Sequence, residues 1–158
     1  MNIFYLDKDP VKCAEYHTDK HVVKMAVESA QILCSAYYFT NETELSPYRL
    51  THPYHPCCVW ARESLANWMW LRSLGLSLCR EYTWRYGKKH ACEAIISSLA
   101  APSLPDIGLT PIKYAFDGRY IISTDPVANY RNYYRLAKSH LFSWRKRDIP
   151  YWLFENDE

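Results

Sequence analysis

Glycine is scarce in this sequence, with only 4 among 158 residues. β-Sandwiches and barrels depend on many tight turns, and glycine is the residue that such turns use most freely. The shortage argues against both fold classes. Long apolar runs are lacking as well, since no stretch reaches the roughly 20 residues that a membrane-spanning helix needs. The first residues include Asp7, Lys8 and Asp9 instead of the apolar centre of a signal peptide. We therefore expect a cytoplasmic protein with no membrane contact.

Paired metal-binding cysteines are also missing. The six cysteines include no Cys-x-x-Cys spacing, so a zinc site held by thiolates is not expected. In a reducing cytoplasm the thiols stay unpaired. Cys34 and Cys79 lie in apolar helical surroundings, which is typical of small core residues. No other pattern indicates a cofactor, so the predicted chemistry rests on the side chains of the protein itself.

Aromatic residues and one basic segment stand out in what is present. Phe, Trp and Tyr make up 16% of the chain, and the formal net charge is only +2, which permits nucleic-acid binding without demanding it. Six basic residues and no acid lie between Arg131 and Arg147, close to several tyrosines and Trp144. Such a mixture suits a phosphate-bearing partner, and it also occurs on ordinary solvated helix faces. Both interpretations stay open.

The chain is expected to form one helical domain over residues 1–158. Residues 1–8 are apolar and aromatic and are predicted to run extended into the core. Asp followed by Pro gives an N-cap and a first-turn residue at two places, and Gly87 suits a helix end. Residues 101–124 are compatible with a small hairpin near 113–123 and with irregular chain. The fold class is therefore mainly all-α, a compact helical bundle. Its predicted helices cover Asp9 to about Tyr38, Pro56 to about Tyr86, His90 to Leu99, and Asp125 to about Phe142.

Seven polar residues form a narrow stripe along the first predicted helix. At about 100° per residue they fall on one helical face, while most of the other positions are apolar. A surface helix normally shows the reverse, a wide polar face and a limited apolar one. Buried ionisable groups are costly unless they are paired or used, so this polar stripe is the first candidate for a functional wall. Its members are Cys13, His17, Lys20, His21, Lys24, Glu28 and Gln31.

Three kinds of chemistry fit the polar stripe to different degrees. His17 and His21 have the i, i+4 spacing of metal ligands, but no glutamate lies between them as in zinc proteases, and the nearby lysines would repel a cation. No metal is therefore expected. Glu28, flanked by hydrophobic residues, can carry protons or stabilise a developing cation. The structural alternative is a simple pair between Lys24 and Glu28. Five ionisable residues on one face favour a functional role.

Three further clusters are candidate substrate-binding groups. The first lies at the entrance of the second predicted helix, where free N–H groups and the helix dipole attract anions. The second lies at the end of that helix, and the third on the last helix. Each cluster fits a binder of phosphates and bases, and each also fits ordinary capping or amphipathic packing. The members are, in chain order, His55 and Arg62; Arg85, Lys88 and His90; and Tyr130, Arg131 and Lys138.

Three segments together resemble a known family. They are the run from Tyr16 to Leu33 (YHTDKHVVKMAVESAQIL), the His55-Pro56…Trp60 unit, and the run from Glu81 to Gly87 (EYTWRYG). They are similar to small phage and bacterial proteins that are grouped, at a distance, with the pyrimidine-dimer DNA glycosylase/AP lyases of the endonuclease V type. The resemblance implies a compact helical bundle whose N-terminal segment runs through the core. It also implies work in the cytoplasm of a host cell if a phage encodes the protein.

The resemblance further implies catalytic roles. The family's catalytic glutamate corresponds to Glu28 and the preceding histidine to His21, and the implied reaction is attack on an N-glycosidic bond, a Schiff base and strand cleavage. The family's nucleophile is the α-amine of a small residue exposed by loss of the initiator methionine. Here Asn2 is too large for that loss, so the amine would belong to Met1. The alternatives are Lys20 or Lys24 as the amine nucleophile, and a glycosylase without a lyase step that uses Glu28 and water.

Two functions from different classes are therefore expected. The first is a DNA glycosylase-like enzyme acting on a pyrimidine base or nucleotide, with His17, Lys20 and Lys24 in the pocket wall and the basic clusters on phosphates. A paired target base would have to be flipped out of the helix. The second is a non-catalytic protein that holds a nucleotide or a nucleotide-derived signal in a cationic, aromatic pocket. The oligomeric state is left open, with a homo-oligomer as one option.

Overall fold

The computed structural model describes residues 1–154, and these residues contain helices and no strand. The expected all-α helical bundle is confirmed. Short 3-10 turns follow several of the helices, among them Ala36–Tyr38 and Ser139–Leu141. None of the helices in this part of the chain is long and apolar enough to cross a membrane. The α-helices are α1 (Pro10–Tyr16), α2 (Asp19–Ser35), α3 (Pro56–Glu63), α4 (Leu65–Tyr86), α5 (Cys92–Ser98) and α6 (Pro126–Ala137).

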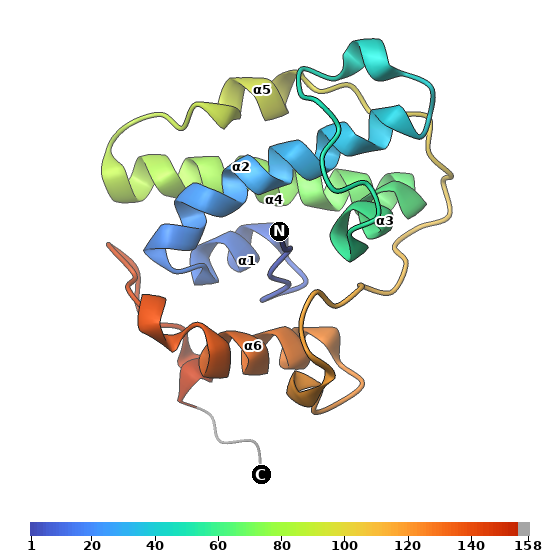
Figure 1. Cartoon of the computed structure of the whole chain (residues 1–158). Helices are drawn as coiled ribbons and strands as arrows, with labels where there is room; N and C mark the ends of the chain where they lie inside the picture. Colours follow the sequence, from blue (N-terminus) through green and yellow to red (C-terminus); the bar gives the residue numbers. More distant parts are fainter. Residues whose placement is uncertain (155–158) are drawn as a thin grey trace.

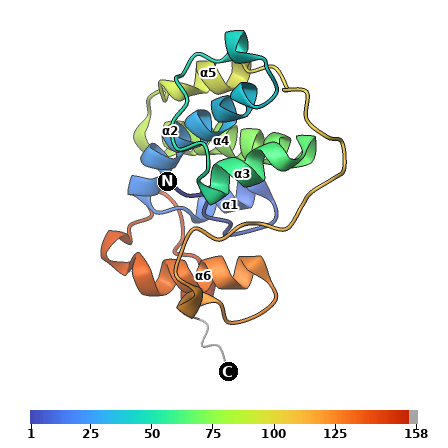
Figure 2. The ribbon, with the colours of Figure 1, turned by 45° about the vertical axis from the view of Figure 1, so that its right-hand side comes forward.

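The helices surround an extended N-terminal segment. Helix α2 packs along α4, and α1 and α3 also pack against α4. Helix α5 lies at the outer side of the pair formed by α2 and α4 (Figure 1). Helix α6 lies on the opposite side of the N-terminal segment, which is therefore enclosed between α6 and the other helices (Figure 2). Ile3, Phe4 and Leu6 are at most 3% exposed. The expectation that residues 1–8 run extended into the core is confirmed for residues 2–6, whereas Lys8 is exposed.

Two side chains of α6 hold the N-terminal segment in place. Arg131 donates from Nε to the carbonyl of Leu6 at 2.8 Å and pairs with the Asp7 carboxylate at 3.1 Å. Tyr130 donates its hydroxyl to the Asn2 side chain at 3.0 Å. An extended segment has no hydrogen-bond ladder of its own, so its buried polar groups need partners of this kind.

The prediction of a single helix at the start of the chain is wrong, because the chain forms two helices, α1 and α2, with an interruption between them. His17 and Thr18 both take extended backbone angles there. The polar groups freed by the interruption bind distant side chains: Arg85 donates to the carbonyls of Glu15 and His17, and the Thr18 amide donates to the Tyr134 hydroxyl at 2.9 Å. These tertiary bonds outweigh the local helical preference. The polar stripe is consequently divided, and His17 does not share a helix with Glu28.

The second expected helix is also two helices. Ser64 is extended between α3 and α4, and its hydroxyl accepts from the Asn67 amide at 3.0 Å. This is an ordinary N-cap. The predicted beginning at Pro56 and the predicted end at Gly87, which has a φ of +70°, are confirmed.

The small hairpin near 113–123 is absent from the described residues. A 3-10 turn, Gly118–Tyr120, occupies the middle of this segment. Its backbone binds α6 instead of a second strand: Asn129 Oδ1 accepts from the amides of Ile122 and Ser123, and Asn132 donates to the Tyr120 carbonyl. Because α6 supplies these partners, the segment stays irregular.

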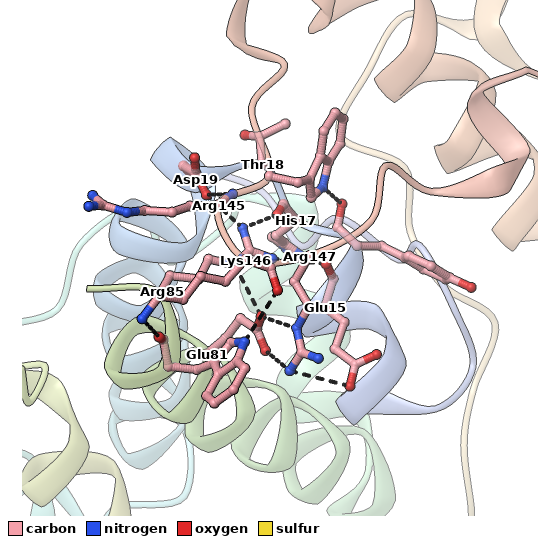
Figure 3. A network of polar contacts seen from close by, with 12 residues as sticks. Glu15, His17, Thr18, Asp19, Glu81, Arg85, Arg145, Lys146 and Arg147 are labelled. Atoms are coloured by element: carbon pink, nitrogen blue, oxygen red, sulfur yellow. Dashed lines mark hydrogen bonds and ion pairs between the residues drawn. The ribbon is translucent and has the colours of Figure 1, made fainter. Parts of the chain in front are cut away.

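A network of ion pairs fastens residues 143–147 to the junction of α1 and α2 (Figure 3). Asp19 accepts from the Ser143 hydroxyl at 2.6 Å and from the Arg145 amide at 2.9 Å. Arg147 pairs with Glu81 at 2.7 Å. Arg85, whose side chain is fully buried, pairs with both Asp19 and Glu81 at 3.0 Å.

Candidate functional site

A pocket of about 180 Å³ opens where the N-terminal segment, α2 and α6 meet. Its wall combines the polar face of α2 with the first residues of the chain, with Ala115 from the segment before α6, and with Tyr133 and Lys138 from the last turns of α6 and its end. Ligand sites for drug-sized molecules usually measure about 300–1,000 Å³, so this pocket suits one ring or one phosphate better than a large ligand. The lining residues are Met1, Asn2, Phe4, His21, Lys24, Met25, Glu28, Ala115, Tyr133 and Lys138.

The N-terminal amine of Met1 lies in this pocket beside a carboxylate. Its nitrogen is 3.3 Å from Glu28 Oε1, and the two side chains are only 7% and 13% exposed. Removing charges from water is costly unless they are paired, and each group supplies the other's partner. The pair therefore brings an amine and a proton acceptor together in a sheltered place.

Positive charge dominates the pocket wall. Lys24 and Lys138 line it together with the Met1 amine, and Glu28 is the single carboxylate among the lining residues. Lys138 Nζ lies 5.6 Å from the ring centre of Tyr133 and 6.0 Å from that of Phe4. Ammonium groups are attracted to aromatic faces at this range. The site thus offers anion-binding groups next to a flat apolar surface.

His21 is a neutral member of the pocket. Burial, followed by electrostatic interactions with His17, Lys138 and Lys24, lowers the pKa of His21 to about 3. Its Nδ1 lies 2.7 Å from the Tyr134 hydroxyl, and its ring stacks on Phe4. A neutral imidazole offers one donor and one acceptor, so His21 can orient a polar group but does not contribute a cation near neutral pH.

Four of the seven members of the polar stripe lie outside the pocket lining, namely Cys13, His17, Lys20 and Gln31. His17 is fully buried, with Nδ1 2.7 Å from the Cys13 carbonyl and Nε2 without a hydrogen-bond partner. Burial lowers the pKa of His17 to about 4. Lys20 is exposed on α2. Of the expected wall, His21, Lys24 and Glu28 are brought together.

His55 lies at the edge of the site, whereas Arg62 supports the loop before α3. His55 caps α3 by accepting from the Cys57 amide at 3.1 Å. The pKa of His55 is lowered overall, mainly by burial and then by the charge of the N-terminal amine. A smaller contribution from the backbone of Met1 opposes this shift. Arg62 donates to the Pro53 carbonyl and stacks on Phe39 at 3.7 Å.

The expected cluster at the end of α4 is not part of the pocket. Arg85 is buried and gives its donors to Glu81, Asp19 and backbone carbonyls. His90 is 8% exposed; one of its ring nitrogens accepts from the Cys92 amide, and the other lies 3.0 Å from the Val23 carbonyl. Lys88 is exposed. Arg85 and His90 thus form hydrogen bonds within the protein itself, whereas contacts with phosphates were expected.

The third cluster is divided in the same way. Lys138 lines the pocket, whereas Tyr130 and Arg131 bind the N-terminal segment from the α6 side. Phe4, Asn2 and Tyr133 are lining residues that the sequence did not single out. The only sequence signal for Phe4 and Asn2 is their place in the buried N-terminal segment, and for Tyr133 it is the aromatic run on α6.

A second, larger recess of about 620 Å³ lies between α1 and residues 146–151. Three of its charged residues form ion pairs, Lys12 with Glu15 and Arg147 with Glu15 and Glu81, and Lys146 donates to the Trp84 carbonyl. The smaller pocket is therefore the better candidate for chemistry.

Within residues 1–154 no group of three or more His, Cys, Asp or Glu side chains is arranged to hold a metal ion. Comparisons of the chain with protein-family models, curated proteins and solved structures find no match.

Proposed function

We propose that this protein is a DNA glycosylase that acts on a pyrimidine nucleotide and uses the α-amine of Met1 as its nucleophile. The observation that carries the proposal is the 3.3 Å contact between that amine and Glu28 inside a cationic pocket. The proposal takes Met1 as the first residue of the mature chain. An amine held beside a carboxylate that can accept its proton is a suitable nucleophile.

The proposed reaction begins with a proton transfer from the Met1 amine to Glu28. The nitrogen lone pair attacks C1′ of the deoxyribose, the C1′–N bond breaks, and the base leaves with the bonding electrons and takes up a proton. The C1′–O4′ bond then opens, O4′ is protonated, and a C1′=N Schiff base remains on Met1. Loss of a C2′ proton and departure of the 3′ phosphate cleave the strand. In this proposal Glu28 moves these protons, and its 3.3 Å contact with the amine supports that role.

The pocket walls support this substrate class. Lys24 and Lys138 suit the phosphates that flank the target nucleotide. Phe4 and Tyr133 offer aromatic surface to a sugar or base. A pocket of about 180 Å³ suits a single ring of one flipped-out nucleotide, and extrusion of this kind is general for enzymes that act on bases. The resemblance of the first helical run to the glycosylase family agrees with this substrate class, and the proposal includes work in the cytoplasm.

Borohydride trapping tests the proposal. Protein is incubated with oligonucleotides that carry an abasic site or a pyrimidine lesion, and borohydride reduces any Schiff base to a stable amine. We expect an adduct that peptide mass spectrometry locates on Met1, and its loss in Glu28→Gln. Glu44→Gln, at an exposed glutamate away from the pocket, is the matched control. An adduct on Lys20 or Lys24 would overturn the assignment of Met1 as the nucleophile. Absence of both an adduct and base release would overturn the proposal that the protein is an enzyme.

The excess of positive charge over one carboxylate also favours a second candidate, a non-catalytic pocket for a nucleotide. Salt dependence separates the two. Affinity for duplex DNA falls steeply with salt because many counterions are released, whereas a small nucleotide meets only the few charges of the pocket. Weak salt dependence with no adduct on any substrate would support the second candidate.

A further inference from the structure

The Asn2 side chain is fastened on both sides, immediately after the residue that carries the amine. Its Oδ1 accepts from the Tyr130 hydroxyl at 3.0 Å and from the Ile3 amide at 2.8 Å, and its Nδ2 donates to the Ala115 carbonyl at 3.4 Å. Asn2 is only 9% exposed. Chain termini are usually poorly ordered unless something ties them down, so these bonds fix the beginning of the chain.

Tyr130 is a rigid partner for this role. It is fully buried on α6 and packs against the rings of Phe116 at 4.8 Å and Tyr114 at 5.8 Å. Burial raises the pKa of Tyr130 well above its ordinary value, so the hydroxyl keeps its proton and can donate to Asn2. The anchor therefore belongs to the helix core and not to a mobile loop.

The Met1 side chain is contacted by a residue at the start of α3. Cys58 Sγ lies 3.7 Å from the Met1 sulfur. With Asn2 fixed on one side and the Met1 side chain on the other, few backbone rotations remain to the amine. Its position beside Glu28 follows from these contacts.

We propose that Asn2 and Tyr130 are positioning residues that hold the Met1 α-amine against Glu28. This inference rests on the proposed function for its consequence in catalysis. The placement of the amine itself can be measured without DNA.

The test compares Tyr130→Phe and Asn2→Leu with the wild type in two measurements. Leucine is large enough to retain Met1, which intact mass confirms. Tyr120→Phe, which also removes a hydroxyl from the aromatic cluster around Tyr133, is the matched control. The first measurement is labelling of the α-amine by formaldehyde and cyanoborohydride, with labelling of lysines as an internal reference. The second is the trapped adduct with abasic DNA.

We expect opposite changes in the two measurements. Labelling of the Met1 amine by formaldehyde rises several-fold in both variants because the amine leaves the shelter of Glu28. The trapped DNA adduct falls by about tenfold or more, since misplacement by about 1 Å can cost about 10²-fold in rate. General loss of structure would raise the labelling of lysines as well and lower the melting temperature, and Tyr120→Phe should change neither measurement.

The two hypotheses fail in different ways. Unchanged α-amine labelling in Tyr130→Phe and Asn2→Leu would overturn the positioning role, whatever the DNA result. A wild-type protein that forms no DNA adduct would overturn the proposed function, and the labelling comparison would still decide whether the anchor places the amine.

Discussion

Phe4 lies nearly flat against His21, with ring centres 4.5 Å apart and planes inclined by 20°. One ring comes from the extended N-terminal segment and the other from α2. The contact shields the imidazole from water, and burial is the main reason why the pKa of His21 falls to about 3. His17, which meets the edge of the same Phe4 ring, has its pKa lowered to about 4.

These two histidines predict a loss of stability in mild acid. An unfolded histidine has a pKa of about 6.5, so acid protonates the unfolded chain before the folded one. The stabilisation is complete above pH 6.5 and is lost as the pH falls toward the folded values. For His17 the loss is on the order of 3 kcal/mol. We expect urea midpoints to fall between pH 6.5 and pH 4.5, and to fall less steeply in His17→Gln; equal slopes in both proteins would contradict the prediction.

Arg85 is predicted to be essential for the fold. Arg85→Met leaves the carboxylates of Glu81 and Asp19 partly unpaired and two carbonyls without a donor. Breaking a buried ion pair from one side typically costs about 3–5 kcal/mol. Urea denaturation should show this loss, whereas Arg80→Met, at an exposed position of the same helix, should change little. Similar midpoints for both variants would show that the network in Figure 3 is not needed.

Gly75 is predicted to permit the close packing of α4 against α2 and α5. A Cβ at this position would lie 3.0 Å from Ile96 Cδ1 and 3.3 Å from Ser29 Cβ. Overpacking of a core typically costs about 1–3 kcal/mol, and we expect Gly75→Val to lower the thermal midpoint accordingly. Gly118→Val, where the added Cβ meets nothing within 4 Å, is the control. A stabilised Gly75→Val would mean that the helices can separate at little cost.

Lys138 is predicted to contact the phosphate backbone if the ligand is DNA. Lys138→Met should weaken binding to all sequences alike and reduce the slope of log affinity against log salt by about 1. Lys88→Met removes a charge that does not line the pocket and should leave the slope nearly unchanged. Equal effects of the two substitutions would place DNA elsewhere on the surface.

The helix beginnings could be predicted because their signals are local. Asp9, His55 and Asp125 each precede a proline and accept from an amide in the first turn, and this pattern is visible in the sequence. The interruption at His17 could not be predicted in the same way. Its backbone partners come from Arg85 and from Tyr134, which lie far along the chain.

The candidate site shows the same division. Periodicity brought His21, Lys24 and Glu28 to one face, because they share one helix and the helical period fixes their directions. It could not separate Lys138 from Arg131, since both are basic residues of the same segment and only the docking of α6 decides which faces the pocket. Phe4 and Asn2 were missed because an extended segment carries no periodic signal for what lies opposite it. The catalytic roles of Glu28 and Met1 stay predictions.

The wall of the pocket joins the first 28 residues to residues 115–138, and this has a consequence for biosynthesis. A nascent chain that ends before Pro126 already contains the amine and Glu28, yet it lacks Tyr130 and every contact that α6 makes. The site therefore matures late, when the last helix docks. Until then the Met1 amine lacks the anchor that Tyr130 gives to Asn2, and the arrangement on which the proposed chemistry depends is complete only with the finished fold.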